Sequence, residues 1–553
     1  MNARGSGVAQ GLPFVGLSYV SMLFWSMLFV LCFLGLGRDL WTPDEPREAE
    51  ISREMLLAPS VVPSLNGRDF IEKPPLYYWT VAGVFAVLKP SAAAARGVSA
   101  GASFLTLVLV FLWGQREFST RVGLIAAFGL ATSLQFAVSS HWIVIDPLLM
   151  LFTTVALWVG SELVRGRSSI PRFVTFYGAL ALAMWTKGLI GPLLVACGLA
   201  TYAALRRSLT PLWSLRPFTG TAVMVLVAAS IAVLIYVDSD AAQVREWLWV
   251  NHVQRFIDPG RTAHDQPFYY YLAALPIAVF PWWAPFVALF RPSTWRGEPS
   301  PHLDAKVVLG AICLGMLLLL GASATKRELY LLPMLPPLSV LLAAQAEAWW
   351  ARRPQGELRG AAWWFQVTCV VLFATVPTIL VLAHLQRTSL QPVDRTAAVF
   401  LTLVAALTAA VVVLAWRGRG TKALGALGAC VVAAVVGLLV VDTRLLAPVK
   451  DMTPFVARVG EQLPHGSPVY ATGDIDETLD GIVPFVTGRV VVSMTASDID
   501  KIRPRYVLVQ DKKGGRTAPQ PGAAYALLED RHFGPGRYMA LWRRRPTDVS
   551  QRR

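Results

Sequence analysis

The sequence predicts an all-α, polytopic membrane protein that ends in a small soluble α/β domain. Hydrophobic residues make up 55% of the 553 positions and charged residues only 15%, whereas soluble domains carry roughly 25% charged residues. Apolar runs of about twenty residues recur along most of the chain, and a helix of that length crosses the roughly 30 Å hydrocarbon core of a bilayer. From about residue 445 onward, charged residues and turn formers return. These observations exclude an ordinary soluble enzyme.

The first apolar run covers residues 14–36 and is predicted to remain as a membrane span. It lacks the small-x-small cleavage pattern that follows a signal peptide. The five cysteines all lie inside apolar runs, so the sequence implies no disulfide framework.

The net charge of +15 reflects arginines and lysines gathered in short connectors between apolar runs. Such clusters are typical of cytoplasmic loops, with contact to anionic lipid head groups as the alternative role, and their distribution argues against a nucleic-acid partner. Placing them in the cytoplasm predicts about thirteen spans, with the N-terminus inside and the C-terminus outside. We therefore expect a transmembrane domain at residues 1–442, with periplasmic loops at 38–75 and 238–267, and a periplasmic α/β domain at 443–553.

Residues 76–88 are apolar but form a shorter stretch than the other predicted spans. A full crossing here would reverse the side of every later loop, against the distribution of arginines. We therefore expect a helix that does not change sides. A full span with a compensating difference elsewhere is the alternative.

The C-terminal segment contains four short runs typical of β-strands, separated by polar segments that suit helices. A small mixed α/β fold of this segment is therefore expected. The four runs read "SPVYATG", "VPFVTGRVVVS", "RPRYVLVQD" and "RYMALWRRR".

A dense patch of charge, "WTPDEPREAEISREML", directly follows the first span. Asp44 and Glu45 lie between two prolines, which predicts a constrained turn. Two acids fixed at the membrane surface suggest a binding function. For the charges from Glu48 to Glu54, the simpler expectation is an interfacial helix with solvated side chains.

Single charged residues mark further corners on the same predicted face. Glu72 and Lys73 precede a Pro-Pro entry into the next apolar helix, where a lysine is either a snorkelling anchor or a ligand contact. Asp146 stands alone in "HWIVIDPLLM", and an isolated carboxylate in apolar sequence favours function over a structural cap. Lys187 in "MWTKGLIGP" is the cationic counterpart.

Two more segments contribute candidate residues. The aromatic loop 246–271 contains Arg255, His252 and His264, and its aromatics also suit an interfacial belt. The two histidines could hold a metal with a nearby acid, although a spacing of twelve fits no compact ligand motif. The corner 323–338 places two cations beside Tyr330.

Taken together, acids and cations gather at one membrane face. Arginine binds phosphate oxygens through paired hydrogen bonds, and lysine contributes a point charge. The pattern predicts a site for an anionic, lipid-linked substrate.

These motifs resemble the protein-mannosyltransferase-like membrane glycosyltransferases of the C-type fold (GT-C), and among them the bacterial aminoarabinose transferases. The resemblance covers about residues 38–340. It rests on "DEPREAEISREML", "LNGRDFIEKPPLYYW", "IDPLL", "TKGLIG", "EWLWVNHVQRF" and "KRELYLLPMLPPL", in this order.

The resemblance implies transfer of 4-amino-4-deoxy-L-arabinose from undecaprenyl phosphate to a phosphate of lipid A, at the periplasmic face of the bacterial inner membrane. Such a modification lowers the affinity of lipid A for polymyxin-type cationic peptides. The implied roles are catalytic for Asp44 and Asp146; donor-phosphate binding for Lys73, Arg255 and Tyr330; and supporting for Glu45, Arg47, Glu72 and Lys187. A divalent metal ion, with Glu72, His252 or His264 as ligands, is an additional hypothesis, and no other cofactor is expected.

Three alternatives stay open at this point. A related transferase would move a sugar from polyprenyl phosphate to a protein or another glycan. A lipid-linked-sugar transporter would need no chemistry, but transporters usually place ionisable residues near the membrane midplane. A scaffold would explain the soluble domain and leave the acids and cations without a role.

Overall fold

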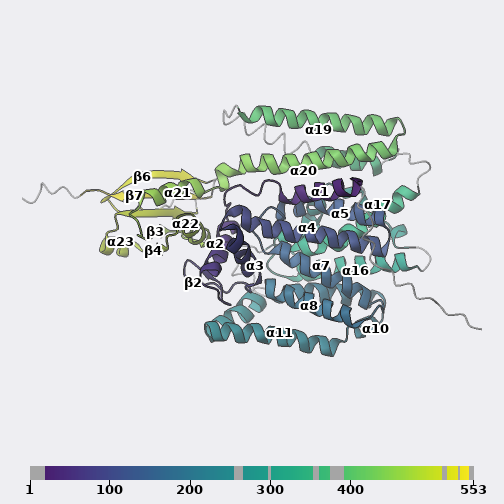
Figure 1. Ribbon diagram of the computed structural model, residues 1–553, viewed down its shortest axis with the longest axis horizontal. Helices are drawn as coiled ribbons and strands as arrows, with labels where there is room; N and C mark the ends of the chain where they lie inside the picture. The colour runs from purple at the N-terminus through teal and green to yellow at the C-terminus, as the bar shows by residue number, and fades with distance from the viewer. Residues whose placement is uncertain are drawn as a thin grey trace, which may run out of the picture.

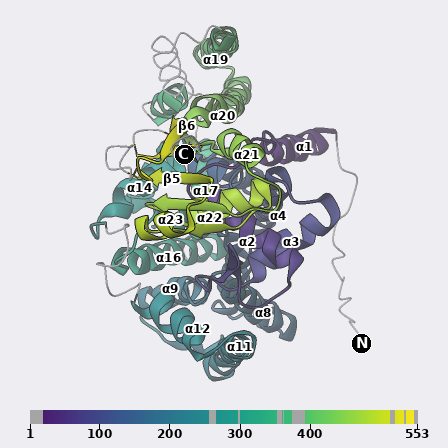
Figure 2. The ribbon, with the colours of Figure 1, turned by 90° about the vertical axis from the view of Figure 1, so that its left-hand side faces the viewer.

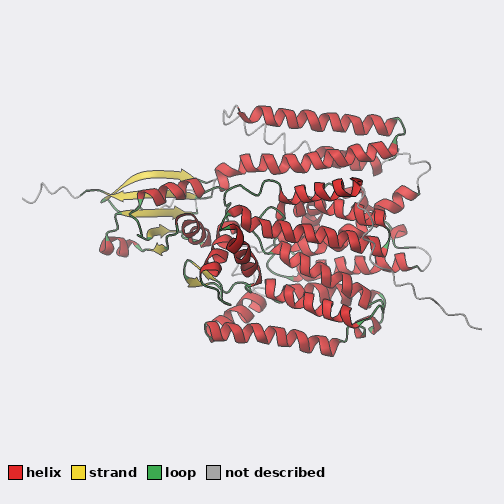
Figure 3. Ribbon diagram, in the orientation of Figure 1, coloured by secondary structure: helices red, strands yellow, loops and turns green. Residues whose placement is uncertain are grey.

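The computed structural model describes residues 19–254, 266–296, 300–352, 360, 362–373, 392–512, 520–533 and 536–546. A large helical bundle occupies most of the molecule, and a β-sheet domain lies at one end of its long axis (Figure 1). The strands are confined to that end, apart from one short hairpin (Figure 3). The predicted helical membrane protein with a C-terminal α/β domain is therefore confirmed.

The bundle consists of helices that range from three residues in η3 to 31 residues in α20. In chain order they are α1 (Tyr19–Phe33), α2 (Asp44–Leu57), α3 (Leu76–Leu88), α4 (Ala92–Glu117), α5 (Thr120–Ala131), α6 (Leu134–Ser139), α7 (Asp146–Leu163), α8 (Ile170–Lys187), α9 (Ile190–Leu205), α10 (Thr210–Trp213), α11 (Pro217–Asp238), α12 (Ala241–Arg245), η1 (Glu246–Gln254), α14 (Tyr270–Val279), α15 (Trp283–Ala288), η3 (Pro292–Thr294), α16 (Pro301–Ala322), η4 (Glu328–Met334), α17 (Leu335–Ala351), Ala362–Phe373, α19 (Pro392–Trp416) and α20 (Gly420–Lys450).

Many of these helices suit a bilayer. Among the described residues, six helical segments are long and apolar enough to cross a membrane, and seven shorter apolar helices accompany them. On α11, Phe218, Leu226 and Val237 are 78%, 68% and 75% exposed. A continuous exposed apolar face is costly in water and favourable against lipid tails. The chain is a membrane protein. The helix predicted at residues 76–88 is α3, whose thirteen residues extend about 20 Å at 1.5 Å per residue.

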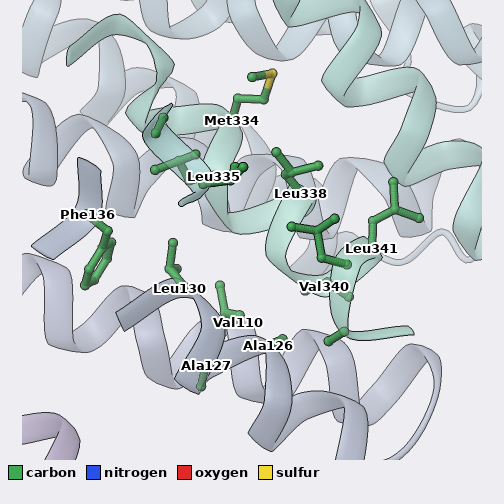
Figure 4. Packing of buried hydrophobic residues seen from close by; sticks show 14 of the residues in the cluster. Val110, Ala126, Ala127, Leu130, Phe136, Met334, Leu335, Leu338, Val340 and Leu341 are labelled. Atoms are coloured by element: carbon green, nitrogen blue, oxygen red, sulfur yellow. The ribbon is translucent and has the colours of Figure 1, made fainter. Parts of the chain in front are cut away.

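The bundle core is packed by α17 and α5. Leu338 and Leu341 of α17 are buried, as are Ala126 and Leu130 of α5, and Figure 4 shows side chains of this cluster. Residues from Leu335 to Gln345 of α17 are all buried, which makes this helix the central element of the bundle.

The C-terminal domain contains one five-stranded sheet in the order β4-β3-β5-β7-β6. β3 runs parallel to β4 and β5, and β7 runs antiparallel to β5 and β6. The elements are α21 (Thr453–Gln462), β3 (Val469–Gly473), α22 (Glu477–Thr487), β4 (Val491–Ser493), α23 (Ala496–Ile502), β5 (Tyr506–Asp511), β6 (Tyr525–His532) and β7 (Tyr538–Arg544).

Two details of the predicted tail were wrong. The first half of "VPFVTGRVVVS" is the end of α22, because its apolar residues lie on one helical face and Gly488 ends the helix with a positive φ of 69°. The prediction also missed β6, an edge strand of which only Tyr525 is buried. At the other end of the domain, α20 continues through the boundary predicted between residues 442 and 443 to Lys450.

The C-terminal domain packs on the bundle through α22 and α2, which lie close together in Figures 1 and 2. A Cβ atom on Gly481 of α22 would lie 2.5 Å from the carbonyl carbon of Pro46 and 2.6 Å from the amide nitrogen of Arg47. A hairpin of β1 (Ser64–Leu65) and β2 (Arg68–Asp69) adds a second contact. At its turn, Asn66 donates to Asp480 at 3.0 Å and to the carbonyl of Val491 at 2.9 Å.

We expect Gly481→Ala to loosen this interface, since the added methyl group has backbone atoms as neighbours and cannot be accommodated by a side-chain rotation. Overpacking of this kind costs about 1–3 kcal/mol. The measurement is the thermal unfolding midpoint, together with the rate of protease cleavage near Lys450. The matched control is Gly425→Ala in α20, where a Cβ meets nothing within 4 Å. Equal behaviour of the two variants would contradict a tight α2–α22 contact.

Candidate active site

A buried carboxylate, Glu45, organises the region that follows the first span. Its side chain is fully buried, and two arginines hold it: Arg38 Nη1 and Arg96 Nη2 each lie 2.7 Å from Oε2. The backbone amides of Trp41 and Ile143 donate to the same carboxylate at 2.8 and 3.1 Å. Glu45 therefore connects α2 to α4 and to the corner that precedes α7.

The same contacts keep Glu45 ionised. Burial by itself would raise the pKa of Glu45, but hydrogen bonds and charge from Arg96 and Arg38 outweigh it and hold the pKa below the usual value. Arg96 is itself fully buried and also donates to the carbonyls of Leu36 and Asp39, both at 2.7 Å. Glu45 is thus a positioning residue whose oxygens are all engaged.

Asp44, the neighbour of Glu45, belongs to a different network. Its Oδ2 lies 2.6 Å from Arg327 Nη2, and its Oδ1 lies 3.2 Å from Arg47 Nη2. Burial would raise the pKa of Asp44, but Arg47, Arg327 and Lys73 together lower it. Asp44 is therefore a carboxylate that stays ionised among cations.

Arg47 is the centre of this second network. One of its terminal nitrogens lies 2.7 Å from Glu48, and the other lies 2.5 Å from Glu477 of the C-terminal domain and 3.8 Å from Glu72. Lys73 contacts the same two acids of the bundle, Glu72 at 3.3 Å and Glu48 at 3.9 Å. The C-terminal domain thus supplies one charged group to the wall of the site.

Asp146 completes the site from the start of α7. Its Oδ1 lies 2.6 Å from Lys187 Nζ, which lies 4.7 Å from the ring centre of Tyr330. Burial would lower the pKa of Arg327, but Asp44, Tyr330 and Asp146 raise it. The charge of Arg327 therefore interacts with the carboxylates of both Asp44 and Asp146. In this way Arg327 connects the Asp44 network to the Asp146 pair.

The site is balanced in charge. Arg47, Lys73, Lys187 and Arg327 each have a carboxylate partner. An entering phosphate must compete with these carboxylates for the cations. Each carboxylate that the phosphate displaces can then form a hydrogen bond or ion pair with another group.

Known proteins resemble both the sequence and the fold. The sequence model of the dolichyl-phosphate-mannose-protein mannosyltransferase family matches residues 72–236. Undecaprenyl phosphate-alpha-4-amino-4-deoxy-L-arabinose arabinosyl transferases of Edwardsiella ictaluri and Pectobacterium carotovorum subsp. carotovorum are 30% and 31% identical over 331 and 339 residues. These alignments cover 58% and 59% of this chain and 58% of each relative, so the chain spans less than two thirds of the relatives' length.

The structural comparison covers a larger part of the chain than the sequence alignments do. ArnT from Cupriavidus metallidurans, in a crystal structure with undecaprenyl phosphate, matches with a TM-score of 0.73 at 19% identity, over 95% of this chain and 98% of that one. Its apo state matches with a TM-score of 0.70. The chain has the ArnT fold. The predicted GT-C fold and the predicted resemblance to aminoarabinose transferases are thereby confirmed.

Within this ArnT fold, most residues predicted for the site lie in the two connected networks. Lys73 and Glu72 lie with Asp44 and Arg47, whereas Tyr330 and Lys187 lie with Asp146. Arg255 and His264 lie outside the described residues, and His252 is described only as part of η1. Within the described part of the chain, no three His, Cys, Asp or Glu side chains form a group that could hold a metal.

The structure corrects two expectations about the charged patch. Asp44 and Glu45 begin α2 instead of forming a turn, because prolines are tolerated in the first turn of a helix and acids are favoured there. Glu48 and Glu50 are 2% and 0% exposed, so these charges are not solvated. Burial raises the pKa of Glu50 to about 7 even though Arg53 lies 2.6 Å away.

The sequence did not identify several partners in the site. Arg327 was noted only as one of two cations near Tyr330, and Arg38 and Arg96 carried no motif that would single them out. Glu477 belongs to a separate domain, which gives no local signal. A search for cations to balance Asp44 and Glu45 would have found the arginines, since buried carboxylates need partners.

We expect Glu45→Gln to destabilise the protein by about 3–5 kcal/mol, because the variant leaves two arginines around an uncharged amide. Asp44→Asn should cost less, since Arg327 is 27% exposed and can be hydrated. Thermal unfolding in detergent, followed by size-exclusion chromatography, measures the difference. If Glu45→Gln melts at the same temperature as Asp44→Asn, then Glu45 does not organise the site.

Proposed function

We propose that the protein transfers 4-amino-4-deoxy-L-arabinose from undecaprenyl phosphate to a phosphate group of lipid A. The observation that carries this proposal is Asp44 held between Arg47 and Arg327 at the end of the bundle where the C-terminal domain packs. The transferase names of the relatives give the sugar and the donor, and the acceptor is the one that the sequence resemblance implies.

The donor phosphate would bind among Lys73, Arg327 and Tyr330, with Arg255 as a further contact. In the reaction, a bond forms between the sugar's anomeric carbon and an acceptor phosphate oxygen. The bond from that carbon to the donor phosphate breaks, and undecaprenyl phosphate leaves with the electron pair. The cations stabilise the charge on the departing phosphate.

Asp44 and Asp146 would act on the sugar and the acceptor. A lipid A phosphate is already ionised at neutral pH and needs no general base. When the donor phosphate takes over Arg327, the Asp44 carboxylate becomes available to bind the sugar's amine or to orient the acceptor. Asp146, paired with Lys187, would hold the other side of the sugar.

The proposed orientation of the protein in the membrane rests on the positive charge of the connectors between its apolar helices. The arginine-rich connectors lie in the cytoplasm by the positive-inside rule, so the site and the C-terminal domain face the periplasm of the inner membrane. This placement gives the site access to lipid A before its export. The expected consequence is reduced sensitivity to polymyxin-type peptides.

A divalent cation is a further hypothesis for the site. Glu72 with His252 or His264 would hold it and lower the repulsion between a carboxylate and an entering phosphate. Glu48 Oε2 fits this idea, since it is buried and has no hydrogen-bond partner among the described residues. Transfer that continues unchanged after treatment of the purified protein with a chelator would remove the metal from the mechanism.

The direct test is mass spectrometry of lipid A from a strain that lacks its own aminoarabinose transferase and expresses this chain. We expect a mass increase of one aminoarabinose and higher survival in polymyxin. Asp44→Ala and Asp146→Ala should abolish both, whereas Glu461→Ala, which removes an exposed acid of the C-terminal domain, should not. Unmodified lipid A from a folded, inserted protein would contradict the proposed sugar or acceptor and favour a related transferase acting on a protein or glycan hydroxyl, with Asp44 as its base.

We also expect Arg327→Ala to weaken donor binding by about ten- to a hundredfold, the usual effect of removing a hydrogen bond to a charged group. Inhibition of transfer by added undecaprenyl phosphate measures this affinity. Arg245→Ala is the matched control, because Arg245 is exposed on the short helix α12 outside the network. An unchanged inhibition constant in Arg327→Ala would remove this arginine from the phosphate site.

A further inference from the structure

A cavity lies between α5, α15, α17, α20 and the helix Ala362–Phe373, away from the candidate active site. Its volume is about 650 Å³, within the range of pockets that hold small ligands. The cavity follows α17 to Trp350. The seventeen residues of α17 span about 25 Å and begin directly after η4, which carries Tyr330. The mouth near Trp350 is therefore at the opposite end of the bundle from Asp44.

The walls of this cavity are mostly apolar, yet they contain two buried donors without acceptors. Leu124, Phe128 and Leu342 are among the apolar lining residues. Gln345 and Trp363 also line the cavity, and their side chains are 9% and 1% exposed. Gln345 Nε2 and Trp363 Nε1 have no hydrogen-bond partner in the described part of the structure. Buried donors left unpaired cost about 1–3 kcal/mol each, so their arrangement suits a ligand with acceptor oxygens.

The mouth of the cavity is cationic. Arg121 and Arg291 line it, and an adjoining hollow of about 690 Å³ adds Lys306. None of these three has an ion-pair partner among the residues described here. The carboxylate of Glu347 is also at the mouth, where it accepts a hydrogen bond from Ser119 at 3.2 Å. Cations remain in excess, and basic pockets between membrane helices bind anionic lipid head groups.

We propose that this cavity binds one anionic diacyl phospholipid from the membrane leaflet opposite the active site. The phosphate lies between Arg121 and Arg291, the ester carbonyls accept hydrogen bonds from Gln345 and Trp363, and an acyl chain fills the apolar part. Gln345 precedes Trp350 by five positions, about 7–8 Å along the helix, which is the depth expected of ester groups below a head group at the mouth. A polyprenyl phosphate has only hydrocarbon at that depth and leaves both donors unpaired.

The bound lipid lies beside a contact between α20 and α5, which both line the cavity. α20 approaches α5 at Gly428, where an added Cβ would lie 3.7 Å from Phe128. The lipid fills the space beside this contact and connects α20 to α17. Because α20 continues to the C-terminal domain, its position affects how that domain is held.

The test uses the full-length protein, purified in detergent and stripped of lipid, with native mass spectrometry as the readout. The probe is dioleoylphosphatidylglycerol. Dioleoylphosphatidylcholine has the same esters without net charge, and undecaprenyl phosphate has the charge without esters. We expect the phosphatidylglycerol to bind more tightly than the phosphatidylcholine, and one bound copy to raise the thermal unfolding midpoint.

Point variants test separately the cationic part of the site, which would bind the phosphate, and the buried donors, which would bind the ester groups. Arg121→Ala should weaken phosphatidylglycerol binding about fivefold, since one basic residue near an anionic surface contributes about that factor, and should leave phosphatidylcholine unchanged. Trp363→Phe and Gln345→Leu should weaken both lipids. The control Arg207→Ala removes an exposed arginine at the end of α9 and should change neither. Arg291→Ala replaces Arg121→Ala if the latter does not fold.

Two results would overturn the proposal. One is phosphatidylglycerol affinity that is equal to that of phosphatidylcholine or unaffected by these variants. The other is undecaprenyl phosphate binding that falls with Gln345→Leu and Arg121→Ala as much as phosphatidylglycerol binding does. The second result would assign the cavity to a polyprenyl chain.

Discussion

The buried ion cluster of Glu45 with Arg38 and Arg96 is the constraint on which the rest of the site depends. Breaking a buried ion pair by removal of one partner leaves an uncompensated charge, so such a cluster allows little movement of the elements that carry it. Glu45 joins the first turn of α2 to α4, and its hydrogen bond from Ile143 joins both to the corner before α7. Asp44 precedes Glu45 directly and Asp146 lies three residues after Ile143. The cluster thereby fixes both candidate acids relative to each other.

The charged side chains of α2 point in different directions and contact two separate groups of residues. Glu45 faces the buried arginines, whereas Asp44, Arg47 and Glu48 face the ion network below the C-terminal domain. α22 covers this second side, and its Gly481 permits the close approach that brings Glu477 to Arg47. A helix that would otherwise be an exposed, charged connector is in this way buried between two domains. The domain interface and the proposed substrate site share Arg47, which contacts both Glu477 and Asp44.

The sequence was sufficient for the general architecture and for most candidate residues, but not for their partners. Hydropathy and the arginine distribution indicate a polytopic membrane protein because bilayer thickness imposes helix length locally. Asp146 stood out because an isolated carboxylate in apolar sequence is conspicuous, whereas Asp44 stood out because it lies with Glu45 between two prolines. The partner of Asp44, Arg327, lies 283 positions away, and Glu477 lies 430 positions from Arg47. Such pairs depend on how the helices pack, which no local pattern encodes. The burial of Glu48 could not be predicted for the same reason.

The cations near the two ends of α17 differ in whether a carboxylate already pairs with them, and this difference affects how a phosphate would bind. At the end near η4, each described cation of the site already has a carboxylate partner, so a phosphate binds these cations only by replacing one ion pair with another. The net gain is small, and a product phosphate can leave when the carboxylate returns. At the other end, Arg121 and Arg291 have no ion-pair partner among the described residues, so a phosphate that binds there displaces no described carboxylate. The first arrangement suits a substrate that must be released after each reaction, whereas the second suits a lipid that stays bound. The distribution of carboxylates, more than that of arginines and lysines, therefore distinguishes a site for turnover from a site for a resident ligand.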